Sequence, residues 1–123
     1  MADGSTNTGR EAMWDVLLAG DLILRLFSNN FSPSNTSVLG DFTEATATGY
    51  SQDTLTGGTH TSTAGAPAIA AWSQRTFTGT GVSQTQYGYY IVHVASGTVW
   101  RYGRFATALP LVSGGSPIRV TPT

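Results

Sequence analysis

The sequence predicts an all-β protein: a single antiparallel β-sandwich or jelly-roll-like domain with a short N-terminal helix and a flexible arm. Three observations lead to this prediction. Of the 123 residues, 19 are Thr and 15 are Gly, a composition that favours strands joined by tight turns. Short runs of alternating apolar and polar residues recur along the chain, and turn-forming residues separate them. The length suits one domain rather than two.

Residues 1–20 are predicted to form the arm and the helix, ahead of a β-sandwich domain at 21–123. Residues 1–9 are small and polar, which is typical of a flexible arm. Residues 10–19 carry apolar side chains at helical spacing. Because so short a helix is marginal alone in water, we expect its apolar face to dock on the sandwich or on a partner. That face consists of Met13, Trp14, Leu17 and Leu18.

The first strand is predicted at residues 21–27, where Leu22, Leu24 and Leu26 alternate with other residues and so share one face. The stretch 59–67 is small and polar and is predicted to be an exposed loop. Similar but weaker patterns predict further short strands at 42–47, 68–72, 75–80 and 118–121.

The clearest strand pair is a hairpin of residues 87–94 and 98–105, joined by a short loop that contains Gly97. Strict alternation would place Val99 and Tyr102 on opposite faces of the second strand. We expect the aromatic side chains of the hairpin to be mostly buried, either in the core or between subunits, so that loss of the tryptophan would cost ~3–5 kcal/mol and prevent folding. These side chains are Tyr87, Tyr89, Tyr90, Trp100, Tyr102 and Phe105.

Charge and cysteine content exclude several classes of function. Six Arg and seven acidic residues, with no Lys, give a net charge of -1. This balance offers no basic surface, so we expect no nucleic-acid partner and no membrane partner. Cys is absent, which removes thiolate metal sites and cysteine nucleophiles and favours folding in a reducing cytoplasm.

No grouping of residue types indicates catalysis, so we predict a protein that is not an enzyme and holds no cofactor or metal. A catalytic Ser–His–Asp triad that uses His60 and Asp53 is a weak alternative, because a chain with this many serines can supply such a set by chance. His93 is expected on the more polar face of its strand. Asp41 and Glu44 would point to opposite faces of a strand, which disfavours a glycosidase pair or a calcium site.

Several motifs follow one another in an order that is specific. They are LRLFSNN at 24–30, GDFTEAT at 40–46, YGYY at 87–90, a second hairpin strand at 100–105 and VTP at 120–122. In this order they resemble a family of small tailed-phage virion structural proteins. The resemblance covers most of residues 10–122. The chain departs from the family pattern at residues 101–103, and the segment 53–67 has no counterpart in it.

The resemblance implies a bacteriophage virion structural protein without enzyme activity. Within that class we predict a capsid decoration (cement) protein on the outer capsid surface, made in the cytoplasm of the bacterial host. The expected partners are the major capsid protein and further copies of the chain, as a homotrimer or another homo-oligomer. Contacts are expected from the apolar helix face and from Asn29 and Asn30. The alternative is a tail-associated or receptor- or carbohydrate-binding module that stacks sugars on Tyr89, Trp100 and Tyr102.

Overall fold

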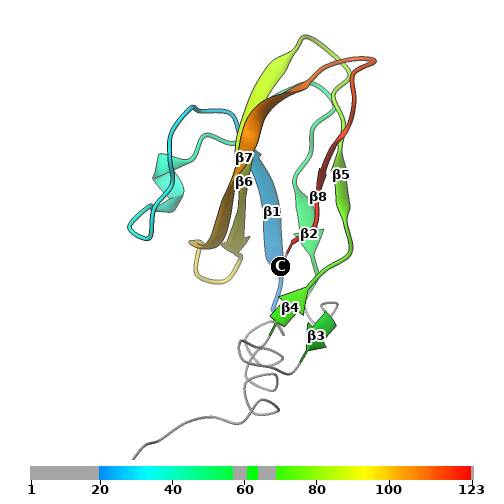
Figure 1. Ribbon diagram of the computed structural model, residues 1–123. Coiled ribbons are helices and arrows are strands. Elements are labelled where there is room, and N and C mark those ends of the chain that lie inside the picture. Colours follow the sequence, from blue (N-terminus) through cyan, green and yellow to red (C-terminus); the bar gives the residue numbers. More distant parts are fainter. Residues whose placement is uncertain (1–19, 57–60, 64–68, 123) are drawn as a thin grey trace, which may run out of the picture.

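The structure, a computed structural model, describes residues 20–56, 61–63 and 69–122, with the backbone alone for 61–63 and 69–71 (Figure 1). The arm and helix predicted at 1–20 lie outside these residues except for Gly20, and so do the four apolar helix residues, Met13, Trp14, Leu17 and Leu18.

All strand pairs in the described residues are antiparallel, and a single 3-10 turn, η1 (Leu39–Asp41), is their one helical element. The all-β prediction is therefore confirmed. The main sheet has the order β2-β1-β6-β7, and two smaller sheets pair β3 with β4 and β5 with β8. The strands are β1 (Leu22–Phe27), β2 (Asp53–Leu55), β3 (Thr61–Thr63), β4 (Ile69–Ala71), β5 (Arg75–Phe77), β6 (Gln84–His93), β7 (Thr98–Leu111) and β8 (Ile118–Val120).

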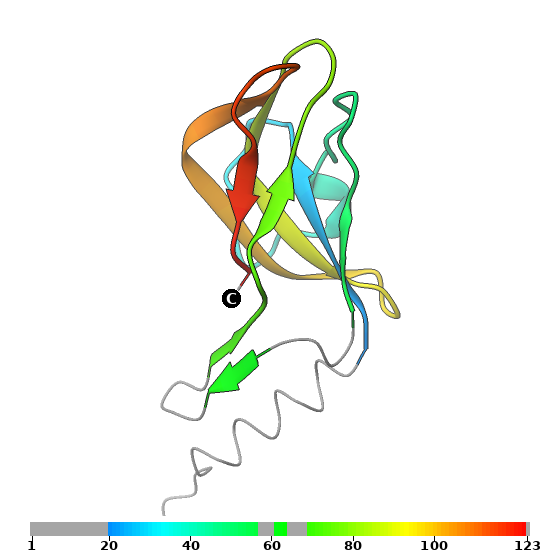
Figure 2. The same cartoon turned by 90° about the vertical axis from the view of Figure 1, so that its right-hand side faces the viewer.

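A hydrophobic core lies between the main sheet and the β5–β8 pair, which stands in front of that sheet in Figure 2. The alternation predicted for the first strand is confirmed, since Leu22, Leu24 and Leu26 are each at most 2% exposed. Phe77 of β5 and Ile118 of β8 pack against them. The remaining members of this main core are Ala45, Ala47, Leu55, Trp72, Ile91, Leu111 and Val120.

A second, aromatic core lies on the other face of the main sheet. The segment 28–44, drawn in cyan beside the sheet in Figure 1, covers this face. Phe42 stacks on Tyr90 with ring centroids 4.5 Å apart, and Phe27 meets Phe42 edge to face at 5.4 Å. Offset and edge-to-face pairs are the favoured geometries of aromatic side chains. Val92 is the fourth buried member of this aromatic core.

The strand predicted at 42–47 is not formed, apart from one isolated bridge between Phe27 and Glu44. The backbone donors of this segment explain the difference. The N–H groups of Thr46 and Ala47 both donate to Oε1 of Gln84, at 2.9 Å each. Because a side chain takes these donors, no neighbouring strand can pair with them.

The loop predicted at 59–67 is wrong in part, because β3 occupies residues 61–63. It pairs with β4, and Ser62 lies opposite Ala70. Thr has a high strand propensity, so a threonine-rich stretch forms a strand once a partner strand is beside it. The strands predicted at 68–72, 75–80 and 118–121 are present as β4, β5 and β8.

The predicted hairpin is confirmed as β6 and β7, but its face assignment is wrong. Ile91 pairs with Arg101 while the next residue of β6 pairs with Val99, so Trp100 is the extra residue of a β-bulge. A bulge shifts the alternation of side chains by one residue. Val99 and Tyr102 therefore both pack on the aromatic core, rather than on opposite faces.

Candidate interaction surfaces

The side chain of Asn29 holds the segment 28–44 in place. Its Nδ2 donates to the backbone oxygen of Asp41, and its Oδ1 accepts from the backbone N–H of Thr43, both at 2.9 Å. Asn29 is half-buried. The side-chain oxygen and NH2 group of Asn29 thus both form hydrogen bonds within the chain. This predicted contact residue therefore has few polar groups left to bind a partner.

Replacing Asn29 with Asp tests this fixation. The carboxylate keeps an acceptor for the Thr43 N–H but faces the Asp41 carbonyl with a second acceptor in place of a donor. We expect the free energy of unfolding to fall by about 1–2 kcal/mol in chemical denaturation. Asn30→Asp is the matched control, because Asn30 only accepts a hydrogen bond, and there we expect no loss. Equal losses in the two variants would contradict the assigned role of Asn29.

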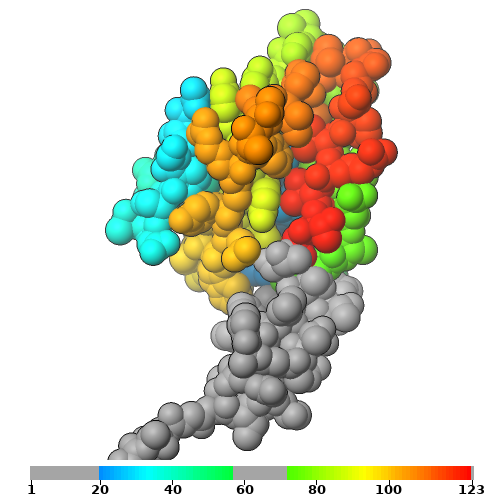
Figure 3. Space-filling view, viewed as in Figure 1, coloured from blue at the N-terminus to red at the C-terminus, as the bar shows by residue number. Residues whose placement is uncertain are grey.

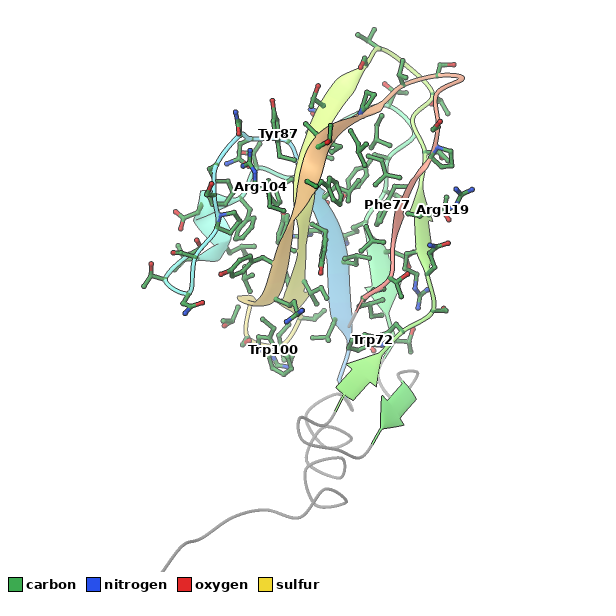
Figure 4. The ribbon with its side chains drawn as sticks, viewed as in Figure 1. Trp72, Phe77, Tyr87, Trp100, Arg104 and Arg119 are labelled. Atoms are coloured by element: carbon green, nitrogen blue, oxygen red, sulfur yellow. The ribbon has the colours of Figure 1, made fainter. Side chains whose placement is uncertain are left out.

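Arg104 of β7 links the segment 28–44 to the main sheet by hydrogen bonds. Its guanidinium donates to the backbone oxygen of Phe31 and, at 2.7 Å, to Oδ1 of Asn30. It also lies over the ring of Tyr87, 5.6 Å from the centroid, and Figure 4 shows these two side chains together. Asn30 itself is exposed. The sequence motifs gave no sign of this contact, because Arg104 lies more than 70 residues away from its partners in the chain.

Trp100 stands at the turn end of the hairpin and is exposed (Figure 4). Its ring stacks on the imidazole of His93, with centroids 4.3 Å apart and an angle of 9° between the planes. Nδ1 of His93 is 2.7 Å from Oγ of Ser96 in the turn. In the single chain 39% of Trp100 is exposed, so the core does not fully bury this residue, and its burial between subunits stays a prediction.

The other two proposed sugar-stacking residues do not share a face with each other. Tyr89 packs on the main core, whereas Tyr102 packs on the aromatic core and its hydroxyl donates to Oδ1 of Asn35 at 3.4 Å. The bulge at Trp100 and the sheet between the two cores separate them. The three side chains therefore form no common platform.

Tyr50 is the centre of a polar contact beside the main core. Its hydroxyl donates to Oε2 of Glu44 at 3.1 Å and accepts from the backbone N–H of Leu26 at 3.2 Å. Glu44 also pairs with Nε of Arg25 at 3.6 Å. Burial raises the pKa of Tyr50 far above its ordinary value of 10.0, and the neighbouring Glu44 raises it further, while the Leu26 N–H opposes the shift. Burial also raises the pKa of Tyr90, against a lowering contribution from Arg25.

These two shifts predict a loss of stability in alkali. The folded chain keeps both hydroxyls protonated to a higher pH than the unfolded chain, which begins to lose these protons near the ordinary pKa of 10.0. The stabilisation is therefore complete below that pH and falls as the pH rises through the folded values. We expect the free energy of unfolding to decline above about pH 10, and to decline less steeply in Tyr50→Phe. Identical slopes in the parent and the variant would contradict the assignment.

The acidic residues considered as a pair do not form a site. Oδ2 of Asp41 accepts from the N–H of Val38 and caps η1, whereas Glu44 is engaged with Tyr50 and Arg25. The strand on which the prediction of opposite faces rested is not formed, because Asp41 ends η1 and Glu44 makes only an isolated bridge. His60 lies outside the described residues. Across the described ranges, no three His, Cys, Asp or Glu side chains come close enough to hold a metal ion, and no helix could cross a membrane.

One shallow apolar cleft of about 260 Å³ lies between the end of β7 and the turn before β8. Its lining residues are Leu109, Pro110, Ser116, Pro117 and Ile118. A single hydroxyl among apolar side chains offers no set of converging polar groups, which small-molecule sites usually contain.

Comparison with known proteins found no match to this chain among family models, curated proteins or solved structures.

Proposed function

We propose that this protein is a non-enzymatic structural component of a tailed-phage virion, a capsid decoration protein that binds the major capsid protein on the outside of the head. The observation that carries the proposal is the position of the motif residues in the fold. Phe27, Phe42 and Tyr90 come from three separate motifs and are in mutual contact in the aromatic core. Asn29 and Arg104, from the first motif and the hairpin motif, fix the covering segment.

Residues that lie far apart in the sequence and carry the resemblance thus build one structural unit. The convergence supports the proposal of a shared fold, and the virion role is carried over from the resemblance alone. The full architecture of a β-sandwich with an N-terminal helix and arm belongs to the same proposal.

The physical character of the chain suits this role. It is small, needs no disulfides, and has a surface of neutral polar groups with few charges. A symmetric capsid offers many identical sites, so weak contacts become strong retention when copies also contact one another. The polar arm at 1–9 can gain contacts by ordering on a capsid neighbour.

A binding assay tests the attachment. Capsids that lack this protein are incubated with the full chain and with a chain that lacks residues 1–9. We expect saturable binding of the full chain that changes less than about threefold between low and high salt, because few charges contribute. The shortened chain should fold and bind more weakly. Absence of binding to capsids would contradict the proposal, and equal binding by the shortened chain would move the anchor to the loops of the β domain.

The exposed Trp100 favours one alternative, a carbohydrate-binding module of the tail. Trp100→Ala separates the two proposals. Since the residue is partly exposed, we expect the variant to fold and to lose only about 1 kcal/mol of stability, less than the ~3–5 kcal/mol expected for a buried tryptophan. A decoration protein should bind capsids as before. Glycan-array binding by the parent chain that disappears in Trp100→Ala would favour the alternative.

A further inference from the structure

The outer edge of β7 is an unpaired strand edge. β7 is the last strand of the main sheet, and its outer side has no partner strand among the described residues. Figure 3 shows β7, in orange, at the molecular surface between the cyan segment near residues 30–40 and the red C-terminal strand. At the opposite edge, the carboxylate of Asp53 in β2 accepts from Nη1 of Arg75 in β5 at 3.4 Å, so a side-chain contact joins β2 to the β5–β8 pair there. Among the described residues, the outer edge of β7 is therefore an edge of the main sheet where a further strand can add.

The hydrogen bonds of β1 identify which backbone groups point outward from β7. The N–H of Leu26 donates to the Tyr50 hydroxyl and its C=O accepts from Ala45, so both groups point away from β6. Backbone groups alternate along paired antiparallel strands. Tyr89, opposite Leu26, therefore directs its N–H and C=O toward Gly103 in β7. It follows that Gly103 and Arg101 bond to β6, whereas Tyr102 and Arg104 direct their N–H and C=O groups outward.

We propose that this edge pairs with the same edge of a second copy of the chain, antiparallel and about a two-fold axis at Gly103. An axis between two residues would set outward groups against inward ones. An axis at 101 or 105 would pair Tyr102 or Arg104 with residues beyond the regular part of β7, which leaves axes at 102, 103 and 104. An axis at Arg104 would place two arginines directly opposite, which is destabilising. An axis at Tyr102 would bring the bulged Trp100 into the ladder, where regular pairing ends.

The register about Gly103 fits the side chains as well as the backbone. Tyr102 lies opposite Arg104 of the second copy, and each such pair exchanges two backbone hydrogen bonds. Arg101 lies opposite Phe105 of the second copy, whose ring packs partly buried against its own main core. Gly103 meets its own counterpart in a non-hydrogen-bonded pair, where strands approach to ~4.5 Å. The ring of Tyr89 takes the place of a side chain over each of these glycines. The two main sheets then become one continuous sheet.

This two-fold pair is a homo-oligomer other than the trimer, a possibility that the sequence left open, and it does not depend on the virion role. The ladder is short, because irregular pairing limits it on both sides, at Trp100 and after Arg104. So small an interface gives a weak, concentration-dependent dimer. A weak pair of this kind would gain strength when many copies are held side by side.

Amide hydrogen exchange, measured by NMR on the purified full chain from about 10 µM to about 1 mM, tests the proposal. We expect the amides of Tyr102 and Arg104 to exchange about tenfold more slowly when nine-tenths of the chain is dimeric, since exchange then requires dissociation. The amides of Arg101 and Gly103 bond to β6 and serve as internal controls that should not change. A chain that sediments as a monomer at 1 mM, or a dimer with unchanged exchange at Tyr102 and Arg104, would overturn the proposal.

Disulfide trapping tests the register, and the natural chain contains no Cys to interfere. Arg101→Cys and Phe105→Cys proteins are oxidised separately and as a mixture. We expect covalent dimers in the mixture alone. In this register, residue 101 of one copy and residue 101 of the other are four residues apart along the strands, or ~13 Å, which is too far for a disulfide. The same holds for residue 105 of the two copies. Arg119→Cys, on the exposed side of β8, should give no dimer. Dimers of Arg101→Cys alone would overturn the register, and if Phe105→Cys fails to fold, the exchange experiment still decides.

Discussion

Phe27→Ala is expected to reduce the free energy of unfolding by ~3–5 kcal/mol, the usual cost of removing a fully buried phenylalanine. Phe27 is 0% exposed and is in ring contact with Phe31 at 5.3 Å, Phe42 at 5.4 Å and Tyr90 at 6.5 Å. Its removal leaves a cavity under the segment 28–44. Because a domain of this size has about 5–15 kcal/mol of stability in total, the variant should unfold at a much lower denaturant concentration.

Phe31→Ala is the matched control for this experiment. Phe31 belongs to the same aromatic group but lies at its rim and is only partly buried. We expect a loss of about 1–2 kcal/mol, measured by guanidinium unfolding followed by tryptophan fluorescence. If both variants lose the same amount, the aromatic core does not stabilise the sheet in the way described, and the segment 28–44 unfolds on its own.

Gly88→Ala is expected to cost about 3 kcal/mol or more, because the new methyl group has no space. A Cβ at Gly88 would collide with the backbone oxygen of Gly103 and would stand 2.5 Å from a ring carbon of Phe27. The backbone oxygen belongs to the β6–β7 ladder and cannot move without breaking it. Phe27 pairs with Gly88 across the strands, and Tyr89 pairs with Gly103 in the same way. Each glycine lies under an aromatic ring of the neighbouring strand, an arrangement that stabilises glycine within sheets.

Gly40→Ala provides the comparison for this substitution. A Cβ at Gly40 meets no atom within 4 Å, and its φ is not positive. We therefore expect a change within about 0.5 kcal/mol, with a small gain from the reduced freedom of the unfolded chain. Thermal unfolding of the two variants side by side gives the difference. A tolerated Gly88→Ala would mean that β6 and β7 are less closely packed than the structure has them.

The sequence was sufficient for features that depend on neighbouring residues. Leu22, Leu24 and Leu26 alternate with period two, and that pattern alone places them on one buried face. The hairpin was predictable for the same reason, since two strand-forming runs flank a short turn at Gly97. In both cases the residues that determine the structure lie next to one another in the chain.

Features that depend on distant residues were not predictable from these patterns. The segment 42–47 has a strand-like sequence, yet Gln84 takes its backbone donors from 37 and 38 positions away. The bulge at Trp100 shifts the alternation by one residue, and no local signal marks it. Asn29 was predicted as a contact residue, whereas its amide is engaged within the chain with Asp41 and Thr43.

The number of copies of this chain in one virion tests the central proposal most directly. Quantitative mass spectrometry of purified particles, with the major capsid protein as the internal standard, gives that number. A decoration protein occupies the repeated sites of the capsid lattice, so we expect hundreds of copies per particle. A count between three and about eighteen would match the symmetry of a tail and contradict the decoration role. Absence from purified particles would contradict the virion assignment altogether.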